Sequence, residues 1–194
     1  MTLSALKVLE LNEKYNLVEG LCEREATNPE GVELEMRVGE VYKMKGEAFL
    51  GVEERTMPET ERLIPWLDKK GREIVTLKPG DYYLVKTIEK VNLPSRKILI
   101  EKGKVLRYLI ADVRPRTNLQ RCGIELICST TNPGYSGELT FGLKNSGNIP
   151  FNLEIGARIA KLYLIPVIGE IKRAYSGQHQ GGRVTSGGKT EKQN

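Results

Sequence analysis

Residues 138–156 read ELTFGLKNSGNIPFNLEIG, and apolar side chains occupy every second position on either side of an Asn-Ser-Gly turn. The alternating positions before and after that turn are Leu139, Phe141, Leu143, Phe151, Leu153 and Ile155. Side chains that alternate with a period of two line one face of a β-strand, while glycine and asparagine favour the turns between strands. The stretch therefore predicts two short, half-buried strands, with a further turn at Gly156.

The same pattern recurs towards the N-terminus. Apolar and charged residues alternate from Val32 to Val38, and the turn Leu77-Lys78-Pro79-Gly80 leads into a strand-forming segment from Asp81 to Val91. Many short strands separated by turns are typical of a sandwich, a barrel or a jelly roll. We therefore expect a mostly β protein.

Two other regions depart from this pattern. Residues Ser4 to Tyr15 carry apolar side chains among charges, which predicts a short N-terminal helix that begins at Thr2 or Ser4. Residues 46–70 are charged and irregular, and we expect Trp66 in that region to be a local packing anchor.

The C-terminal tail differs in composition from the rest of the chain. We expect one β domain over residues 1–175 and a flexible tail over residues 176–194, which holds five glycines and a single aliphatic residue, Val184. A segment with so little apolar surface cannot bury a core of its own, so we expect it to be disordered when no ligand is bound.

Composition restricts the chemistry. The chain has 194 residues, 39% of them hydrophobic, and a net charge of +5, which weakly favours anionic partners. Three cysteines without a CxxC pair argue against a disulfide framework and a structural zinc site. The single histidine, His179, makes a Ser-His-Asp triad improbable and excludes a multi-histidine metal site within one chain.

The sequence has no feature that places the protein in a membrane. No apolar run approaches the ~20 residues of a transmembrane helix, and the N-terminus lacks a signal pattern. We expect a cytoplasmic protein with no membrane partner.

Two segments carry candidate binding residues. In Arg114 to Gly123, Thr117 can cap a short helical turn, and Arg116 and Arg121 offer forked donors that suit phosphate oxygens. Taken alone, the spacing favours a capped turn with solvated arginines. Residues 132–138 form a tight turn in which Tyr135 could stack on a sugar or a base, or belong to an ordinary turn.

In this order the motifs resemble those of the dCTP deaminase and trimeric dUTPase family, most clearly over residues 77–175. The matching pieces are Leu77-Lys78-Pro79-Gly80, Thr87-Ile88-Glu89, Arg116-Thr117-Asn118-Leu119, Pro133-Gly134-Tyr135-Ser136-Gly137, Asn145-Ser146-Gly147, Gly156-Ala157-Arg158-Ile159-Ala160 and Tyr175-Ser176-Gly177. The resemblance implies a distorted jelly roll of the β-clip type, a homotrimer with active sites between subunits, and a structural or interface role for Arg158.

The resemblance also implies a site for a deoxynucleoside triphosphate, dUTP or dCTP, with Mg²⁺ arriving on the phosphates and no metal ligand from the protein. Tyr135 would pack under the deoxyribose, and the glycine-rich tail would close over the triphosphate. The phosphate-binding residues would be Arg116, Thr117, Asn118, Arg121, Gln180, Gly181, Gly182, Arg183, Thr185 and Ser186. The base- and sugar-binding residues would be Ile127, Ser129, Thr130, Tyr135 and Tyr175.

The catalytic positions depart from the family. Gly142 stands where the deaminases have a proton-shuttling glutamate, and Asn132 stands where the dUTPases have a water-activating aspartate. Neither glycine nor an amide is a general base, although Glu138 lies nearby in sequence and could substitute. The candidate catalytic residues are therefore Asn132 and Glu138.

These departures leave several functions open. The favoured interpretation is a dUTP pyrophosphohydrolase that yields dUMP and diphosphate. The alternative is a catalytically weak or inactive nucleotide-binding or regulatory paralogue, and Gly142 opposes dCTP deamination. Nucleic-acid binding would rest on charge alone, because the tail has too few aromatic residues for base stacking.

Overall fold

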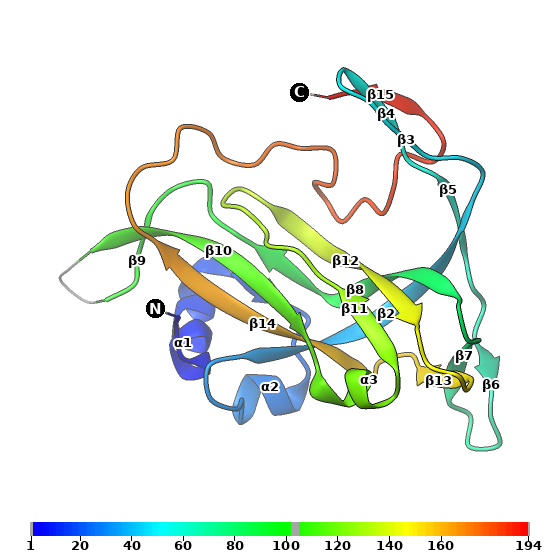
Figure 1. The fold of residues 1–194 in the computed structure, drawn as a ribbon. Helices are drawn as coiled ribbons and strands as arrows, with labels where there is room; N and C mark the ends of the chain where they lie inside the picture. Colours follow the sequence, from blue (N-terminus) through cyan, green and yellow to red (C-terminus); the bar gives the residue numbers. More distant parts are fainter. Residues whose placement is uncertain (1, 102–104, 194) are drawn as a thin grey trace.

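A nine-stranded sheet forms the body of the protein. The structure, a computed structural model, describes residues 2–101 and 105–193. In the main sheet the strand order is β11-β12-β8-β2-β14-β10-β9, with β1 beside β8 and β5 beside β2, and all pairs are antiparallel (Figure 1). Its strands are β1 (Val18–Glu19), β2 (Leu34–Lys45), β5 (Glu59–Arg62), β8 (Tyr82–Asn92), β9 (Ile98–Leu99), β10 (Leu106–Pro115), β11 (Ile124–Ile127), β12 (Ser136–Asn145) and β14 (Arg158–Val167).

The long strand β2 connects the two halves of this sheet. Its first part, through Arg37, pairs with β14, and its next part, from Val38 to Tyr42, pairs with β8. The register shifts between Val38 and Glu40, and such an irregularity bends a strand and increases its twist. The sheet therefore curls, which gives the mostly β, distorted jelly-roll fold predicted from the sequence.

Alternation explains which faces are buried. In β8 the side chains of Tyr83, Val85, Thr87, Glu89 and Val91 are all buried, whereas their neighbours are exposed or half-buried. The predicted strand segments at residues 32–38 and 81–91 are confirmed, with β2 continuing further, to Lys45. The largest fully buried apolar side chains of the core are Leu17, Leu34, Met36, Leu77, Leu109, Ile124, Leu143, Ile159, Leu162 and Leu164.

The two strands of residues 138–156 lie in different sheets. The first is β12 of the main sheet, and the second is β13 (Phe151–Glu154), which pairs with β7 (Glu73–Leu77) in a small sheet that β6 (Trp66–Leu67) completes. In this sheet the Trp66 side chain remains 47% exposed and its Nε1 donates to Thr76 Oγ1 at 3.2 Å. Trp66 thus links β6 to β7 through this hydrogen bond and is not part of the hydrophobic core.

The helices are short. The predicted N-terminal helix is α1 (Ala5–Tyr15), whose N-cap is Ser4, with the Ser4 hydroxyl accepting from Lys7 N at 3.2 Å. The other two are α2 (Glu23–Thr27) and α3 (Thr117–Arg121). Helix α1 turns Ala5, Val8 and Leu11 towards the core.

A third, small sheet involves the tail. Strand β15 (Thr190–Lys192) pairs with β4 (Glu54–Thr56), which also pairs with β3 (Phe49–Leu50). The region 46–70, predicted to be irregular, therefore contains four short strands. Strand β3 pairs with β4, β5 with β2 and β6 with β7, and only β4 also has a partner at the far end of the chain, β15. Figure 1 shows the tail running in orange and red along one side of the main sheet to this third sheet.

Candidate functional site

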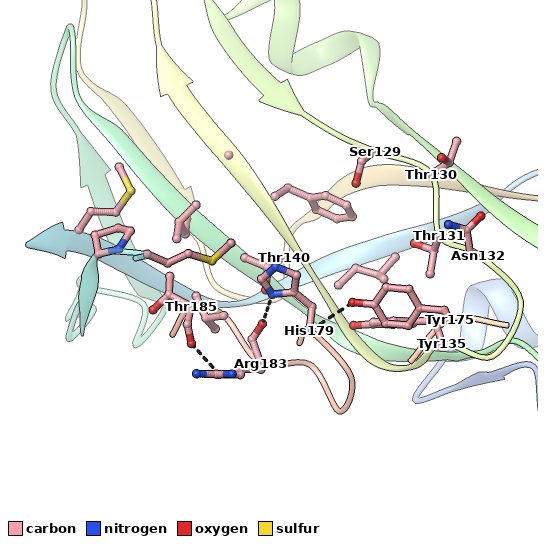
Figure 2. A pocket seen from close by; sticks show the side chains of 18 residues that line it. Ser129, Thr130, Thr131, Asn132, Tyr135, Thr140, Tyr175, His179, Arg183 and Thr185 are labelled. Carbon is pink, nitrogen blue, oxygen red and sulfur yellow. Dashed lines mark hydrogen bonds between the residues drawn. The ribbon is translucent and has the colours of Figure 1, made fainter. Parts of the chain in front are cut away.

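A cavity of about 510 Å³ lies on the face of the main sheet beneath the tail (Figure 2). Gly142 of β12 pairs with Leu84 of β8, which pairs in turn with Tyr42 of β2, so side chains two residues apart on these strands share one face. Thr140, Gly142, Leu84 and Met44 accordingly form the floor of the cavity.

Loop 129–132 and two tyrosines form a side wall. Ser129, Thr130 and Asn132 of the loop line the cavity together with Tyr135 and Tyr175. The rings of the two tyrosines meet edge to face, with centroids 5.6 Å apart. Burial raises the pKa of Tyr135 to about 12, and Tyr175 and Glu138 add to the rise. The Tyr135 hydroxyl therefore stays protonated and donates to the Glu138 carbonyl.

The tail forms the roof with His179, Arg183, Val184 and Thr185. Arg55 Nε donates a hydrogen bond to Gln178 Oε1 at 2.8 Å, which fixes the orientation of the Gln178 amide. In this orientation the amide nitrogen Nε2 of Gln178 lies 3.0 Å from His179 Nε2. Since an amide nitrogen only donates, Nε2 accepts, and Nδ1 carries the proton that it donates to the Arg183 carbonyl at 3.1 Å. His179 thereby fixes the course of the tail over the cavity.

The floor has one unused polar group and one small residue. The Thr140 hydroxyl is buried and has no hydrogen-bond partner among the described residues. A buried polar atom without a partner costs free energy, so a ligand that bonds to Thr140 Oγ1 recovers that cost. Beside it, a Cβ atom on Gly142 would collide with the Tyr82 hydroxyl and would stand 2.8 Å from Tyr82 Cζ. The Tyr82 ring in this position therefore leaves no room for a side chain at residue 142.

The two candidate catalytic residues lie in different surroundings. Asn132 lines the cavity and is exposed. Glu138 is absent from the lining, because its carboxylate faces Lys90 at 3.9 Å and Lys86 at 4.0 Å and lies against Gly182 of the tail. The described residues that line the cavity include no aspartate or glutamate, and among them His179 alone has an aromatic nitrogen that can accept a proton.

The arginine segment lies elsewhere. Arg116 Nε pairs with Glu35 Oε1 at 2.6 Å, and the same carboxylate binds Arg158 Nη1 and Arg24 Nη1, the latter at 3.1 Å. Glu25, only 1% exposed, accepts from Glu35 N at 3.0 Å and also binds Arg24. This cluster of two buried carboxylates and three partly exposed arginines holds the start of α3, the start of β14 and α2 against β2.

The predicted cap of α3 is wrong. The N-cap position is Arg116, not Thr117, and it makes no side-chain cap hydrogen bond. The reason is that Arg116 already provides the first carbonyl of the turn, which accepts from Leu119 N at 3.1 Å, so Thr117 is the first helical residue.

The structure thus gathers part of the predicted site in one chain. The predicted residues that line the cavity are Ser129, Thr130, Asn132, Tyr135, Tyr175, Arg183 and Thr185. Those outside its lining are Arg116, Thr117, Asn118, Arg121, Ile127, Glu138, Gln180, Gly181, Gly182 and Ser186. Gln180 and Gly181 nevertheless attach the tail to the turn before β12, through Gln180 Nε2 to Gly134 O at 2.9 Å and Gly181 N to Ser136 O at 2.8 Å.

Several lining residues were not identified from the sequence. These are Met44, Met57, Pro58, Leu84, Thr131, Leu139, Thr140, Phe141, Gly142, His179 and Val184. For Leu84 and Thr140 the alternation of β8 and β12 was a usable signal, but only strand pairing shows that both face the same cavity. For Met57 and Pro58 the sequence carries no such signal.

The donor set does not fit a metal held by the protein. In residues 2–101 and 105–193 no group of three or more His, Cys, Asp or Glu side chains is arranged so that it could hold a metal ion. The side chains of this site therefore do not provide a cage for Mg²⁺, which is commonly bound through substrate phosphates with few protein ligands.

None of the helices in the described part of the chain has the length and hydrophobicity to cross a membrane.

Comparison with known proteins identifies the family. The model of dCTP deaminase-like proteins matches residues 3–167. A protein named "Probable deoxyuridine 5'-triphosphate nucleotidohydrolase" from Methanothermobacter thermautotrophicus is 33% identical over 156 residues, 80% of this chain and 89% of that protein. A dCTP deaminase from Thermococcus kodakarensis is 31% identical over 117 residues, 60% of this chain and 68% of the relative.

A solved structure agrees with this assignment at the level of the fold. The crystal structure of 2'-deoxycytidine 5'-triphosphate deaminase from Agrobacterium tumefaciens superposes with a TM-score of 0.57 at 14% identity, covering 84% of this chain. This chain spans 47% of that one. By sequence over most of its length, and by its curled antiparallel sheet, the chain belongs to the dCTP deaminase-like family.

Proposed function

We propose that this protein binds a pyrimidine deoxynucleoside triphosphate in the cavity beneath its tail and hydrolyses dUTP to dUMP and diphosphate. The observation that carries the proposal is the gathering of Ser129, Thr130, Asn132, Tyr135 and Tyr175 around one cavity that the tail covers. Its volume of about 510 Å³ lies within the range of small-molecule sites. Relatives over most of the chain are named as dUTP nucleotidohydrolases.

Each part of the wall has a role in this proposal. The edge-to-face pair of Tyr135 and Tyr175 provides a rigid apolar surface for the deoxyribose. The Thr140 hydroxyl is available to bond the base. The tail residues His179, Arg183 and Thr185 close the cavity and exclude bulk water from the reaction.

Hydrolysis is favoured over deamination because of the floor. A deaminase needs a group that moves protons to and from the attacking water, and Gly142 has no side chain to do so. The Tyr82 ring stands in the space that a side chain at 142 would need. In the hydrolase, the Asn132 amide would orient the attacking water, while Mg²⁺ bound with the triphosphate would neutralise phosphate charge.

A specific observation supports a second candidate, a binding protein with weak or no turnover. No carboxylate is found among the described residues that line the cavity, and Glu138 is turned to Lys86 and Lys90. Loss of a general base costs roughly 10²–10⁴ in rate. Such a protein would bind the triphosphate and leave it intact.

Product analysis separates the candidates. Purified protein is incubated with dUTP and, separately, dCTP with Mg²⁺, and the products are resolved by ion-exchange chromatography. We expect dUMP and diphosphate from dUTP and no product from dCTP. Intact triphosphates, with a thermal shift on their addition, would establish the binding protein, and release of ammonia from dCTP would contradict the proposal.

The cavity itself is tested with Thr140→Val, which keeps the shape of the side chain and removes the hydroxyl. We expect about a tenfold loss in affinity for a non-hydrolysable dUTP analogue, the equivalent of one hydrogen bond. Thr140→Ser, which retains a hydroxyl, is the matched control and should bind within about twofold of the wild type. Equal binding by both variants would remove Thr140 from the site.

A further inference from the structure

His179 is the only histidine of the chain, and both of its ring nitrogens are used within the tail. The side chain is half-buried, with Nε2 at 3.0 Å from Gln178 Nε2 and Nδ1 at 3.1 Å from the Arg183 carbonyl. The backbone N–H of His179 donates to the Tyr175 hydroxyl at 3.2 Å (Figure 2). The imidazole is therefore fixed in the roof of the cavity.

The hydrogen bonds that lead to His179 run in a single direction. Arg55 can only donate, so the oxygen of the Gln178 amide faces Arg55 and the nitrogen faces His179. Reversal of this amide would place its nitrogen against the Arg55 Nε–H, donor against donor. The chain of bonds is therefore complete only when His179 is neutral and carries its proton on Nδ1.

This chain of bonds is part of the attachment of the tail turn, residues 178–183, to the third sheet. Arg55 of β4 and Glu191 of β15 are paired residues of that sheet. Arg55 holds the turn through Gln178, and Glu191 holds it through Arg183 Nη1 at 2.6 Å. His179 connects the two attachments, because it bonds to Gln178 on one side and to the Arg183 carbonyl on the other.

The charges around His179 also disfavour a second proton on its ring. A second cavity, of about 880 Å³, lies on the other side of the tail turn, and His179 lines both cavities. The charged groups in the described lining of this second cavity are four cations and one carboxylate, Arg55, Arg173, Arg183 and Lys192 against Glu191. Arg183 already pairs with that carboxylate, and the further titratable groups in the described lining of the first cavity are Tyr135 and Tyr175. A protonated imidazole would add to this surplus of positive charge.

We propose that His179 is a positioning residue for the roof of the first cavity and that it acts only in its neutral form. On protonation Nε2 becomes a donor that faces the donor of Gln178, so the turn loses one of its two attachments to the third sheet. Val184 and Thr185 follow the turn and line the cavity, so they move away with it. Acid thus opens the roof. Opening is a property of the chain itself, whereas its effect on ligand affinity rests on the proposed function.

The direction of the pH dependence follows from which state can take up the proton. The closed roof requires a neutral His179, whereas an imidazole in an open tail takes up a proton near pH ~6.5, as exposed histidines do. Proton uptake by the open state alone favours opening by up to about tenfold for each pH unit below that value. We therefore expect about tenfold less protection of the tail at about pH 5.5 than at about pH 7.5.

Amide hydrogen exchange on the full chain, read by mass spectrometry and corrected for the pH dependence of chemical exchange, measures this opening in peptides that cover residues 177–186. His179→Asn keeps a donor for the Arg183 carbonyl and cannot take up a proton. Its tail protection should therefore stay the same at the two pH values. Peptides from β8 provide the internal reference, and thermal melting verifies folding of each variant at both pH values.

Gln178→Glu should reverse the sign of the effect. A carboxylate at this position accepts from Arg55 and from a protonated His179, so acid should now increase the protection of the tail. Gln120→Glu is the matched control, because it adds the same charge at an exposed position that lines neither cavity. It should respond to pH as the wild type does. The same response in Gln178→Glu as in the wild type would reduce His179 to a structural residue.

The single histidine also makes the tautomer measurable. Nitrogen NMR of the imidazole at about pH 7.5 should find the proton on Nδ1. A proton on Nε2 would overturn the chain of bonds from Arg55. Equal tail protection of the wild type at the two pH values, or an equal fall in His179→Asn, would overturn the proposal.

Ligand binding is measured separately, with a non-hydrolysable imido analogue of dUTP. The affinity ratio of the wild type to His179→Asn at one pH cancels the titration of the analogue's own phosphates. This ratio should fall by about threefold or more from about pH 7.5 to about pH 5.5. An unchanged ratio would overturn the link between roof and ligand. If the analogue binds at neither pH, the proposed function fails, and hydrogen exchange still decides whether His179 holds the roof.

Discussion

At the scale of single residues, Gly142 and Tyr82 compete for the same space on the cavity floor. A Cβ at 142 would meet the Tyr82 hydroxyl and Cζ, the far end of an exposed side chain, so Gly142→Ala should displace the ring and destabilise the protein by about 0.5–1 kcal/mol. The measurement is urea denaturation. The same reasoning predicts that Gly142→Glu, which restores a carboxylate in the sequence, produces no deaminase while Tyr82 remains.

The double-mutant cycle with Tyr82→Ala provides the control. Once the ring is absent, Gly142→Ala should cost less than it does in the wild type, by an interaction energy of about 0.5 kcal/mol. An equal cost in both backgrounds would show that the two positions do not compete. Tyr82 is about one-third exposed, so its own removal creates little cavity.

Cys128 and Cys122 differ in their surroundings although they are close in sequence. Burial raises the pKa of Cys128 to about 12, with a further rise from Asp112, so this thiol stays protonated at pH 8. Cys122 is exposed. Because the thiolate is the reacting form, iodoacetamide at pH 8 should modify Cys122 well before Cys128, as peptide mass spectrometry can measure. Equal rates would contradict the burial of Cys128.

At the scale of elements, Glu35 on β2 holds three other elements through its arginine partners. The Glu35 carboxylate is buried, whereas the side chains of Arg116, Arg158 and Arg24 are 26%, 31% and 43% exposed, so water can solvate these charges when Glu35 is lost. Glu35→Gln should therefore lower the unfolding free energy by about 1.5–3 kcal/mol in urea denaturation, which is the range for lost hydrogen bonds to a charged group. Arg116, Arg158 and Arg24 lose their common acceptor in this variant.

Glu61→Gln is the control for this element. Glu61 pairs with Lys45 at 2.6 Å, and both side chains are 54% exposed. Exposed pairs contribute about 0–1 kcal/mol, so this variant should differ little from the wild type. Similar losses in the two variants would mean that the cluster around Glu35 is not a buried network.

The strands of the main sheet were predictable because their pattern is local. Alternation in β8 and β12 and the Ser4 cap of α1 can be read within a dozen residues of sequence. The partners of Glu35 could not be read in this way, since Arg116 and Arg158 lie far along the chain and Glu35 looks like any charged residue of an alternating strand. The pairing of β15 with β4 was missed for the same reason, because neither strand has an apolar pattern and each depends on the other.

The candidate site was predictable only as far as the family motifs extend. Tyr135, Asn132 and Tyr175 belong to those motifs and meet at the cavity. Thr140 and Leu84 reach it through strand pairing. Contacts of this kind follow from topology, which composition and spacing do not specify.

At the scale of the whole molecule, the predicted phosphate-binding segment and the cavity are separate. Helix α3 lies at one edge of the molecule in Figure 1 and the tail at the opposite side, and no residue of α3 lines the cavity beneath the tail. If Arg116 binds the phosphates of a nucleotide in the first cavity, that cavity must belong to another copy of the chain. A homotrimer with sites between subunits, expected from the family resemblance, would satisfy this condition.

Mixing two defective variants tests this arrangement. Arg116→Ala removes the proposed phosphate ligand, and Thr130→Trp fills the first cavity from an exposed loop position. Each variant alone should bind little of the dUTP analogue. Refolded together in equal amounts, they should regain roughly a quarter of the wild-type sites, because half of the cavities are intact and half of those adjoin an intact Arg116. A chain with both changes, mixed with either single variant, should regain none. Full binding by Arg116→Ala alone would remove this arginine from the site, and no recovery in trimers of mixed composition would place Arg116 and the cavity in separate functions.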